Sequence, residues 1–294
     1  ADAEAEPLAV GIAEFRRDLA FQHRRADRLE DAGVLVRLEP ADIDGNGTIE
    51  EGEGHQLLLV GDMTGDMSGN CPTNIRVGDN VLTNPTYVNE VANNDNCFAF
   101  NEMFPGGFTP KFGGTIKDFS IAAGIKGETD LLVEDLSYDI SFYKGENEVD
   151  FFIRNTINPS LGPNTPNEFK PGKYIQSEQS INLDVSKFME LSGDKDLNIA
   201  GGIEFRDESY ESIAGDSKSW EVGPLASQGF GIGSNGFPGL PDRAAGKAER
   251  DSMALYIDLE SNVTDNLMLS GAIRYEDFSD FGDTTKGKIA FRYQ

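Results

Sequence analysis

The sequence is poor in basic residues. It has 25 lysines and arginines against 51 aspartates and glutamates in 294 residues, a formal net charge of -26. Phosphate contacts need basic patches, so this balance argues against nucleic-acid binding and against docking on an anionic lipid surface through a basic patch. An excess of carboxylates instead suits a surface that binds cations or faces a calcium-rich exterior.

Long apolar runs are also missing. No run approaches the roughly 18 residues of a membrane helix. The start, ADAEAEPLAV, is typical of a mature chain rather than of a signal peptide. Neither absence excludes a membrane location, because barrel strands need only about 9–11 alternating residues.

Cysteine and histidine are scarce. Cys71 and Cys97 bracket a polar, Asn-rich stretch, which predicts a disulfide in an oxidising compartment, with two free thiols as the alternative. Neither cysteine has a CxxC or His partner at ligand spacing. His23 and His55 are the only histidines and form no cluster. We find no nucleophile–base set, so we predict that the chain is not an enzyme.

The composition changes near residue 110. Residues 1–110 are expected to be loop-rich, with a short helix ending at Gly33, although Leu19, Phe21 and Leu29 do not form a helical stripe. Residues 111–294 read as strand after strand. The period-two segments are KDFSIAAGIKG, DLSYDISFYKG, SINLDVSKF, LNIAGGIEFRDES, SMALYIDLES, NLMLSGAIRYED and KGKIAFRYQ.

The connections between these segments alternate in length. SGDKD and SNVTDN are short, whereas residues 155–174 and 209–251 are long and rich in Gly, Pro and Ser. Short turns at one end and long loops at the other are typical of outer-membrane barrels. We therefore predict an all-β fold, an antiparallel transmembrane β-barrel segment with long extracellular loops.

Alternation alone also fits a soluble sandwich. The polar positions are Glu204, Arg206, Asp258, Glu260, Arg274, Glu276, Lys288 and Arg292. If the sheet belongs to a barrel, Asp258, Arg274 and Arg292 point into the lumen and the apolar residues point away. The outward set is Leu255, Ile257, Leu269, Ile273, Ile289 and Phe291. Packing of this set against a second sheet would instead indicate the sandwich.

The sharpest local motif is DIDGNGTIEEGE, residues 42–53, which fits the twelve-residue calcium loop. The predicted ligands are Asp42, Asp44, Asn46, the Thr48 carbonyl, Glu50 through water, and Glu53 as the bidentate carboxylate. The Gly-rich exit is a poor start for a second helix, and no second loop of this kind is present. We expect a structural calcium site in an extracellular loop, with an acidic, solvated turn as the alternative.

The C-terminal half resembles a known family. ALYIDLESNVTDNLMLSGAIRYEDFSDFGDTTKGKIAFRYQ is similar to the mid-barrel segment of TonB-dependent outer-membrane receptors, through Leu259 and Glu260, residues 274–282, Lys288, Ala290, Arg292 and Tyr293. Residues 151–186 and 198–216 resemble the same family. The resemblance covers roughly residues 112–294.

The resemblance implies a 22-stranded barrel with an internal plug that imports a scarce nutrient. We find no plug and no energy-coupling box, and the strands are too few to close such a barrel, so we expect an internal piece of a longer receptor. The implied partners are outer-membrane lipid, the energy-coupling protein TonB through the missing plug, and a small-molecule nutrient. That nutrient is a ferric siderophore, cobalamin or oligosaccharide. The alternative is a secreted calcium-binding β-sandwich module with an adhesive or structural role.

Overall fold

The computed structural model describes residues 9–21, 36–43, 45–50, 54–77, 81–191 and 195–294. The long strands are β1 (Ala9–Phe21), β6 (Lys111–Thr129), β7 (Leu136–Arg154), β9 (Gly172–Glu190), β10 (Asp196–Ala214), β11 (Gly246–Thr264), β12 (Leu267–Phe278) and β13 (Gly282–Tyr293). The short strands are β2 (Val36–Pro40), β3 (Gly54–Leu58), β4 (Gly61–Asp62), β5 (Cys97–Phe98) and β8 (Glu168–Phe169). Short helical turns are η2 (Val81–Thr83), η3 (Tyr87–Val91), η4 (Phe100–Glu102), η5 (Pro159–Asn164), η6 (Ser217–Ser219), η7 (Ala226–Gln228) and η8 (Asp242–Ala244).

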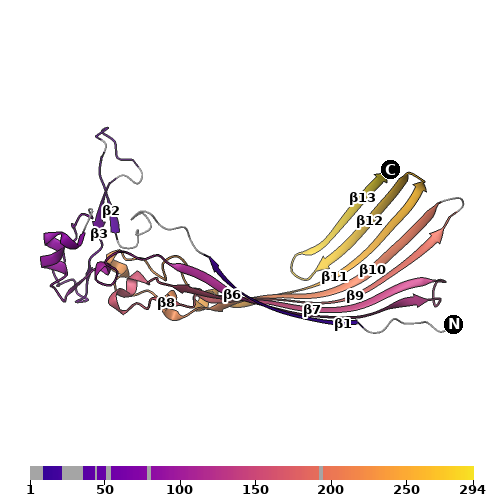
Figure 1. Cartoon of the computed structure of the whole chain (residues 1–294), viewed down its shortest axis with the longest axis horizontal. Coiled ribbons are helices and arrows are strands. Elements are labelled where there is room, and N and C mark those ends of the chain that lie inside the picture. The colour runs from indigo at the N-terminus through magenta and orange to yellow at the C-terminus, as the bar shows by residue number, and fades with distance from the viewer. Residues whose placement is uncertain (1–8, 22–35, 44, 51–53, 78–80, 192–194) are drawn as a thin grey trace.

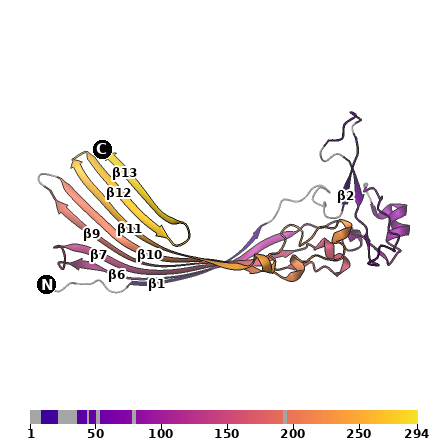
Figure 2. The same ribbon diagram turned by 180° about the vertical axis from the view of Figure 1, so that it is seen from behind.

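The long strands form one antiparallel sheet in the order β1-β6-β7-β9-β10-β11-β12-β13, and β8 pairs with β7 beside this path. The sheet is curved and open, with β1 and β13 at its two edges (Figures 1 and 2). It is not closed into a barrel. The other two sheets have two strands each, β2-β3 and β4-β5.

One end of the sheet carries tight turns. Residues 130–135 join β6 to β7, and Asp130 closes this turn by accepting a hydrogen bond from the Asp135 backbone N–H. Residues 265–266 join β11 to β12, where the Thr264 hydroxyl oxygen accepts the Asn266 and Leu267 amides. We call this end of the sheet the turn end. The opposite end carries residues 155–171 and 215–245, which are long connections.

These long connections fold together with residues 54–110 into a compact lobe at one end of the molecule (Figure 1). The lobe holds two apolar clusters. The first contains Leu58, Val60, Ile75, Val81, Tyr87, Val91, Cys97 and Ala99, and the second contains Leu59, Phe98, Phe100, Ile157, Leu225 and Phe230. Successive side chains of an extended segment point to opposite sides, so Leu58 belongs to the first cluster and Leu59 to the second.

Buried polar side chains tie the two loops of the lobe to each other. Asn158 is fully buried, and its amide donates to the carbonyls of Lys218 and Glu221. Its side-chain oxygen accepts the Ser160 hydroxyl and the Gly233 amide. A buried polar group costs free energy unless it is paired, so these bonds fix the relative position of the loops.

Glycine permits the closest approach between these loops. A Cβ on Gly223 would lie 2.2 Å from the Ser160 carbonyl oxygen, and one on Gly239 would lie 1.8 Å from the Ser219 hydroxyl oxygen. No side chain larger than hydrogen fits at either position without moving the backbone.

One expectation for the first part of the chain is wrong. The described part of the expected helix, up to Phe21, is strand β1, paired along its length with β6. Helical periodicity was weak here, and the free edge of a long strand offers a complete backbone partner. The described part of residues 57–110 consists mainly of loops with short strands and helical turns, and it carries the first apolar cluster.

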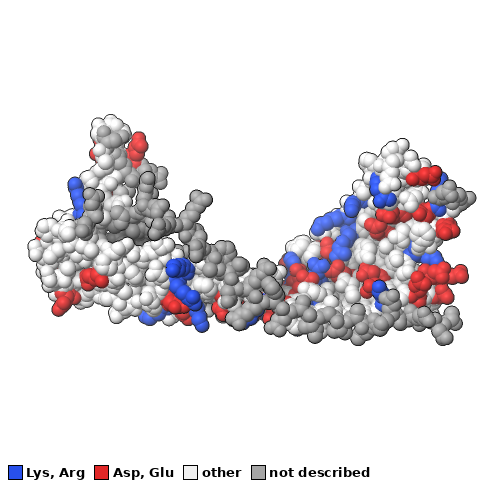
Figure 3. Space-filling model, viewed as in Figure 1, with Lys and Arg blue, Asp and Glu red and all other residues white. Residues whose placement is uncertain are grey.

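No helix among the described residues is both long enough and apolar enough to span a bilayer. Charged side chains are unevenly distributed in the view of Figure 3. They gather over the sheet, while the lobe presents few of them on this face.

Candidate functional site

The sheet has one apolar face at its turn-end half, which we call the apolar belt. Its side chains alternate with polar or small ones on the long strands β6, β7 and β9 to β13. The belt comprises Ile121, Ile125, Tyr138, Ile140, Phe142, Ile181, Leu183, Val185, Ile199, Ile203, Phe205, Met253, Leu255, Ile257, Leu259, Leu269, Ile273, Tyr275, Ile289, Phe291 and Tyr293. No second sheet in the described chain packs against it, and Ile257 and Ile273 are 45% and 51% exposed.

The belt ends on a sharp line. Phe142, Ile181, Phe205 and Met253 are paired in register across β7, β9, β10 and β11. The next positions on the same face, toward the lobe, are Lys144, Gln179, Asp207 and Asp251, which are also paired in register. Polarity therefore switches on four neighbouring strands within two residues, about 7 Å along each strand.

The opposite face carries the charges. Glu204 accepts hydrogen bonds from Arg206 and, at 2.9 Å, from Arg274. Arg274 also pairs with Glu276 at 2.8 Å. The side chain of Glu204 is 16% exposed. The lower exposure of this face compared with the apolar belt is expected if the sheet curves around its polar face, which crowds the side chains there.

Further hydrogen bonds on the polar face involve Asp184 and Glu208. The Tyr256 hydroxyl donates to Asp184 across two strands at 2.6 Å, and Arg250 donates to Glu208 from Nε at 3.0 Å. A strand surface of this kind is suited to face water and polar solutes.

Nearer the lobe, the polar face carries a row of aromatic rings. Phe112 and Phe151 stack at 5.5 Å between centroids, Phe151 contacts Tyr174 edge-on at 5.3 Å, and Tyr174 contacts Tyr210 at 5.5 Å. Phe237, from the loop of residues 215–245, stacks on Phe112 at 4.4 Å. The row thus begins under the lobe and continues onto the open sheet.

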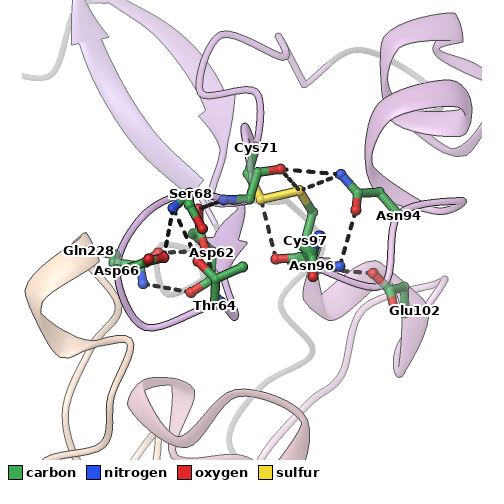
Figure 4. The surroundings of a disulfide bond; sticks show 12 residues. Asp62, Thr64, Asp66, Ser68, Cys71, Asn94, Asn96, Cys97, Glu102 and Gln228 are labelled. Carbon is green, nitrogen blue, oxygen red and sulfur yellow. Dashed lines mark hydrogen bonds between the residues drawn. A yellow bond between two sulfur atoms is a disulfide. The ribbon is translucent and has the colours of Figure 1, made fainter.

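The predicted disulfide is confirmed. The sulfur atoms of Cys71 and Cys97 are bonded, and their Cα atoms lie 5.5 Å apart. Figure 4 shows the bond beside a loop that folds around Asp62. The Gln228 side chain, from the loop of residues 215–245, reaches this loop and pairs with the Asp62 backbone N–H and carbonyl at 2.7 and 2.9 Å.

The carboxylate of Asp62 organises this loop. It accepts hydrogen bonds from the Thr64 hydroxyl, the Thr64 amide and the Gly69 amide. These bonds, the Thr64 hydroxyl first, lower the pKa of Asp62 from its ordinary value of 3.8. The pKa of Asp66 is lowered by its bonds to Ser68.

The predicted calcium loop is only partly described, because Asp44 and Glu53 lie outside the described residues. The Asp42 carboxylate accepts the amides of Gly45, Asn46 and Gly47, and Asn46 accepts the Thr48 amide. These bonds close a turn around the Asp42 carboxylate. No group of three or more His, Cys, Asp or Glu in the described chain is arranged to hold a metal, and the ligand set with Glu50 stays a prediction.

Sequence reasoning missed the aromatic row and Asn158. Tyr174 and Tyr210 lie where the strands no longer alternate in polarity, so the pattern gave no signal for their facing. Trp220, in the loop of residues 215–245, donates its ring N–H to the Gly215 carbonyl at 3.2 Å. This hydrogen bond stabilises the loop in which Trp220 lies.

A scan against protein-family models, a search of curated proteins and a search of solved structures found no match to this chain.

Proposed function

We propose that this chain is part of an outer-membrane transporter of the TonB-dependent kind, which binds and imports a scarce nutrient without bond chemistry. The observation that carries the proposal is the apolar belt, which is exposed, continuous over seven strands and bounded on β7, β9, β10 and β11 by a change of polarity in register. A face of this size is unusual on a soluble monomer, and it suits contact with lipid tails.

The rest of the sheet supports the same proposal. The polar face carries networks of ion pairs, such as the one that joins Glu204, Arg274 and Glu276, and would line a water-filled lumen. The strands of 19 residues are about 63 Å long, roughly twice what a tilted strand needs to cross a bilayer. The half nearer the lobe would project outside the membrane, with the lobe extracellular. An oxidising exterior suits the disulfide.

The open edges of β1 and β13 require pairing with further strands if the sheet is to form a closed wall in lipid. In this proposal those strands lie outside the described sheet. A plug within the completed wall would link the transporter to the energy-coupling protein TonB.

The alternative of a calcium-binding sandwich is less well supported. A sandwich buries the apolar faces of two sheets against each other, and here the apolar belt has no second sheet over it in the described chain.

Paired charge substitutions on adjacent β11 residues test the proposal. Ile257→Arg places a charge on the belt, whereas Asp258→Arg changes a charge on the opposite face. In lipid vesicles, Ile257→Arg should destabilise insertion by about 2–4 kcal/mol, as for charges at the middle of a bilayer. Asp258→Arg should insert nearly as well as the parent. Equal flotation of all three proteins with vesicles, or failure of the parent to float, would contradict the proposal.

A further inference from the structure

The outer part of the aromatic row is accessible to solutes. Phe237 covers the inner part, where it stacks on Phe112 and lies 5.6 Å from Phe151. Tyr174 and Tyr210 continue the row beyond this contact, and Tyr210 is 46% exposed. Two neighbouring tyrosine rings on a polar surface, one of them exposed, can serve as a stacking platform.

Hydrogen-bonding side chains flank this platform in register. Gln176 is directly opposite Tyr210, and Glu178 is opposite Glu208, all on the same face. Gln176 is exposed. Amide and carboxylate groups beside aromatic rings can accept hydrogen bonds from hydroxyl groups while the rings contact C–H surfaces.

The local charges disfavour an anionic ligand. The arginines that share this part of the polar face are both paired with carboxylates, Arg206 with Glu204 and, at 3.7 Å, with Glu178, and Arg250 with Glu208. The lysines and the arginine of β13 that lie on the same face are three strands away from β10. With a total charge of -26, the chain would repel an anion approaching Tyr210.

We propose that Tyr174 and Tyr210, with Gln176 and Glu178, form a subsite for a neutral oligosaccharide. Sugar rings would stack on the two tyrosines, and Gln176 and Glu178 would accept hydrogen bonds from ring hydroxyls. This inference rests on the proposed function, because it names the class of nutrient among those that the transporter could import.

The test is equilibrium binding to the full chain in detergent micelles, measured by calorimetry. The probes are maltoheptaose, cellohexaose and xylohexaose, a neutral ferric hydroxamate and an anionic ferric catecholate. At least one oligosaccharide should bind, and Tyr210→Ala should weaken its binding about tenfold or more, the equivalent of about 1.4 kcal/mol. Tyr210→Phe should retain most of the affinity because it keeps the ring.

The matched control is Tyr143→Ala. Tyr143 lies on the same face of β7 and is 38% exposed, but it is outside the row. Its replacement should leave oligosaccharide affinity unchanged. Three results would overturn the inference: no oligosaccharide binds, only a ferric complex binds, or Tyr143→Ala and Tyr210→Ala weaken binding equally.

Vesicle flotation separates these failures from failure of the proposed function. A parent protein that floats with vesicles but binds no oligosaccharide leaves the transporter proposal standing and removes this subsite.

Discussion

Ile157 in the lobe is fully buried, whereas Ile257 in the sheet leaves 45% of its surface exposed. The lobe collects its apolar side chains between loops and pairs its buried polar atoms with one another. The sheet instead spreads its apolar side chains over one face and its charges over the other. The lobe therefore buries its own apolar side chains, whereas the sheet leaves its apolar face exposed.

The largest effect should come from removing the disulfide. Replacing Cys71 and Cys97 together by serine should destabilise the lobe by about 3.5 kcal/mol in the chain-entropy model for a sequence separation of 26. Hydrogen exchange should show faster opening of amides in residues 54–104, and unchanged protection in β9 and β10. Equal loss of protection in the lobe and the sheet would show that the two regions unfold together rather than independently.

Breaking the buried polar network should have the next largest effect. Asn158→Ala removes the partner of the Ser160 hydroxyl and the Gly233 amide and should cost about 2–3 kcal/mol, since each buried group left unpaired costs about 1–3 kcal/mol. The matched control is Asn182→Ala on the sheet, where the amide makes one long bond of 3.5 Å to Ser180. Chemical denaturation followed by Trp220 fluorescence should separate the two variants, and equal midpoints would argue against the network.

Acid should loosen the lobe before the sheet loses its backbone pairing. The folded-state pKa values of Asp62 and Asp66 are lowered below 3.8, so their ionised forms stabilise the folded loop above that pH. This stabilisation is lost as the pH falls through the lowered values. Hydrogen exchange of the Gly69 amide between about pH 5 and pH 1 should show this loss, after correction for the intrinsic rate. Asp62→Asn should remove most of the dependence, and an unchanged profile in that variant would contradict the assignment.

Calcium should have the smallest effect on the molecule as a whole. If residues 42–53 bind calcium, affinity in the range of about 10⁻⁴–10⁻³ M is expected for an extracellular site. Glu53→Gln should weaken the binding measured by calorimetry and leave the strands beyond residue 112 unchanged. Absence of heat at millimolar calcium would reduce the motif to an acidic turn held by Asp42.

The sequence predicts the sheet better than it predicts the lobe. In β10, the alternation from Leu197 to Phe205 predicts a strand with one apolar face, and the strand is observed. It continues to Ala214, however, because pairing with β9 and β11 extends past the point where one face stops being apolar. From Asp207 onward both faces carry polar residues, so the pattern no longer marks the strand.

The lobe could not be predicted because its contacts join distant parts of the chain. Leu59 packs in one cluster with Ile157 and Leu225, and Gln228 pairs with Asp62 across 166 positions. Single residues in Gly-rich loops give no periodic signal for such contacts. The disulfide was predictable because only two cysteines are present. The described part of the expected helix, up to Phe21, is a strand because pairing with β6 replaced a weak helical pattern.

A nitroxide scan along β11 in lipid vesicles tests the lipid-facing belt most directly. Single cysteines from Lys247 to Glu260 can be labelled because Cys71 and Cys97 are bonded to each other. We predict that labels at Met253, Leu255, Ile257 and Leu259 are accessible to oxygen dissolved in lipid and shielded from a water-soluble relaxation reagent. Labels at alternate positions, and at Asp251 and beyond toward the lobe, should show the reverse. Equal access of the water-soluble reagent to Ile257 and Asp251 would contradict the account.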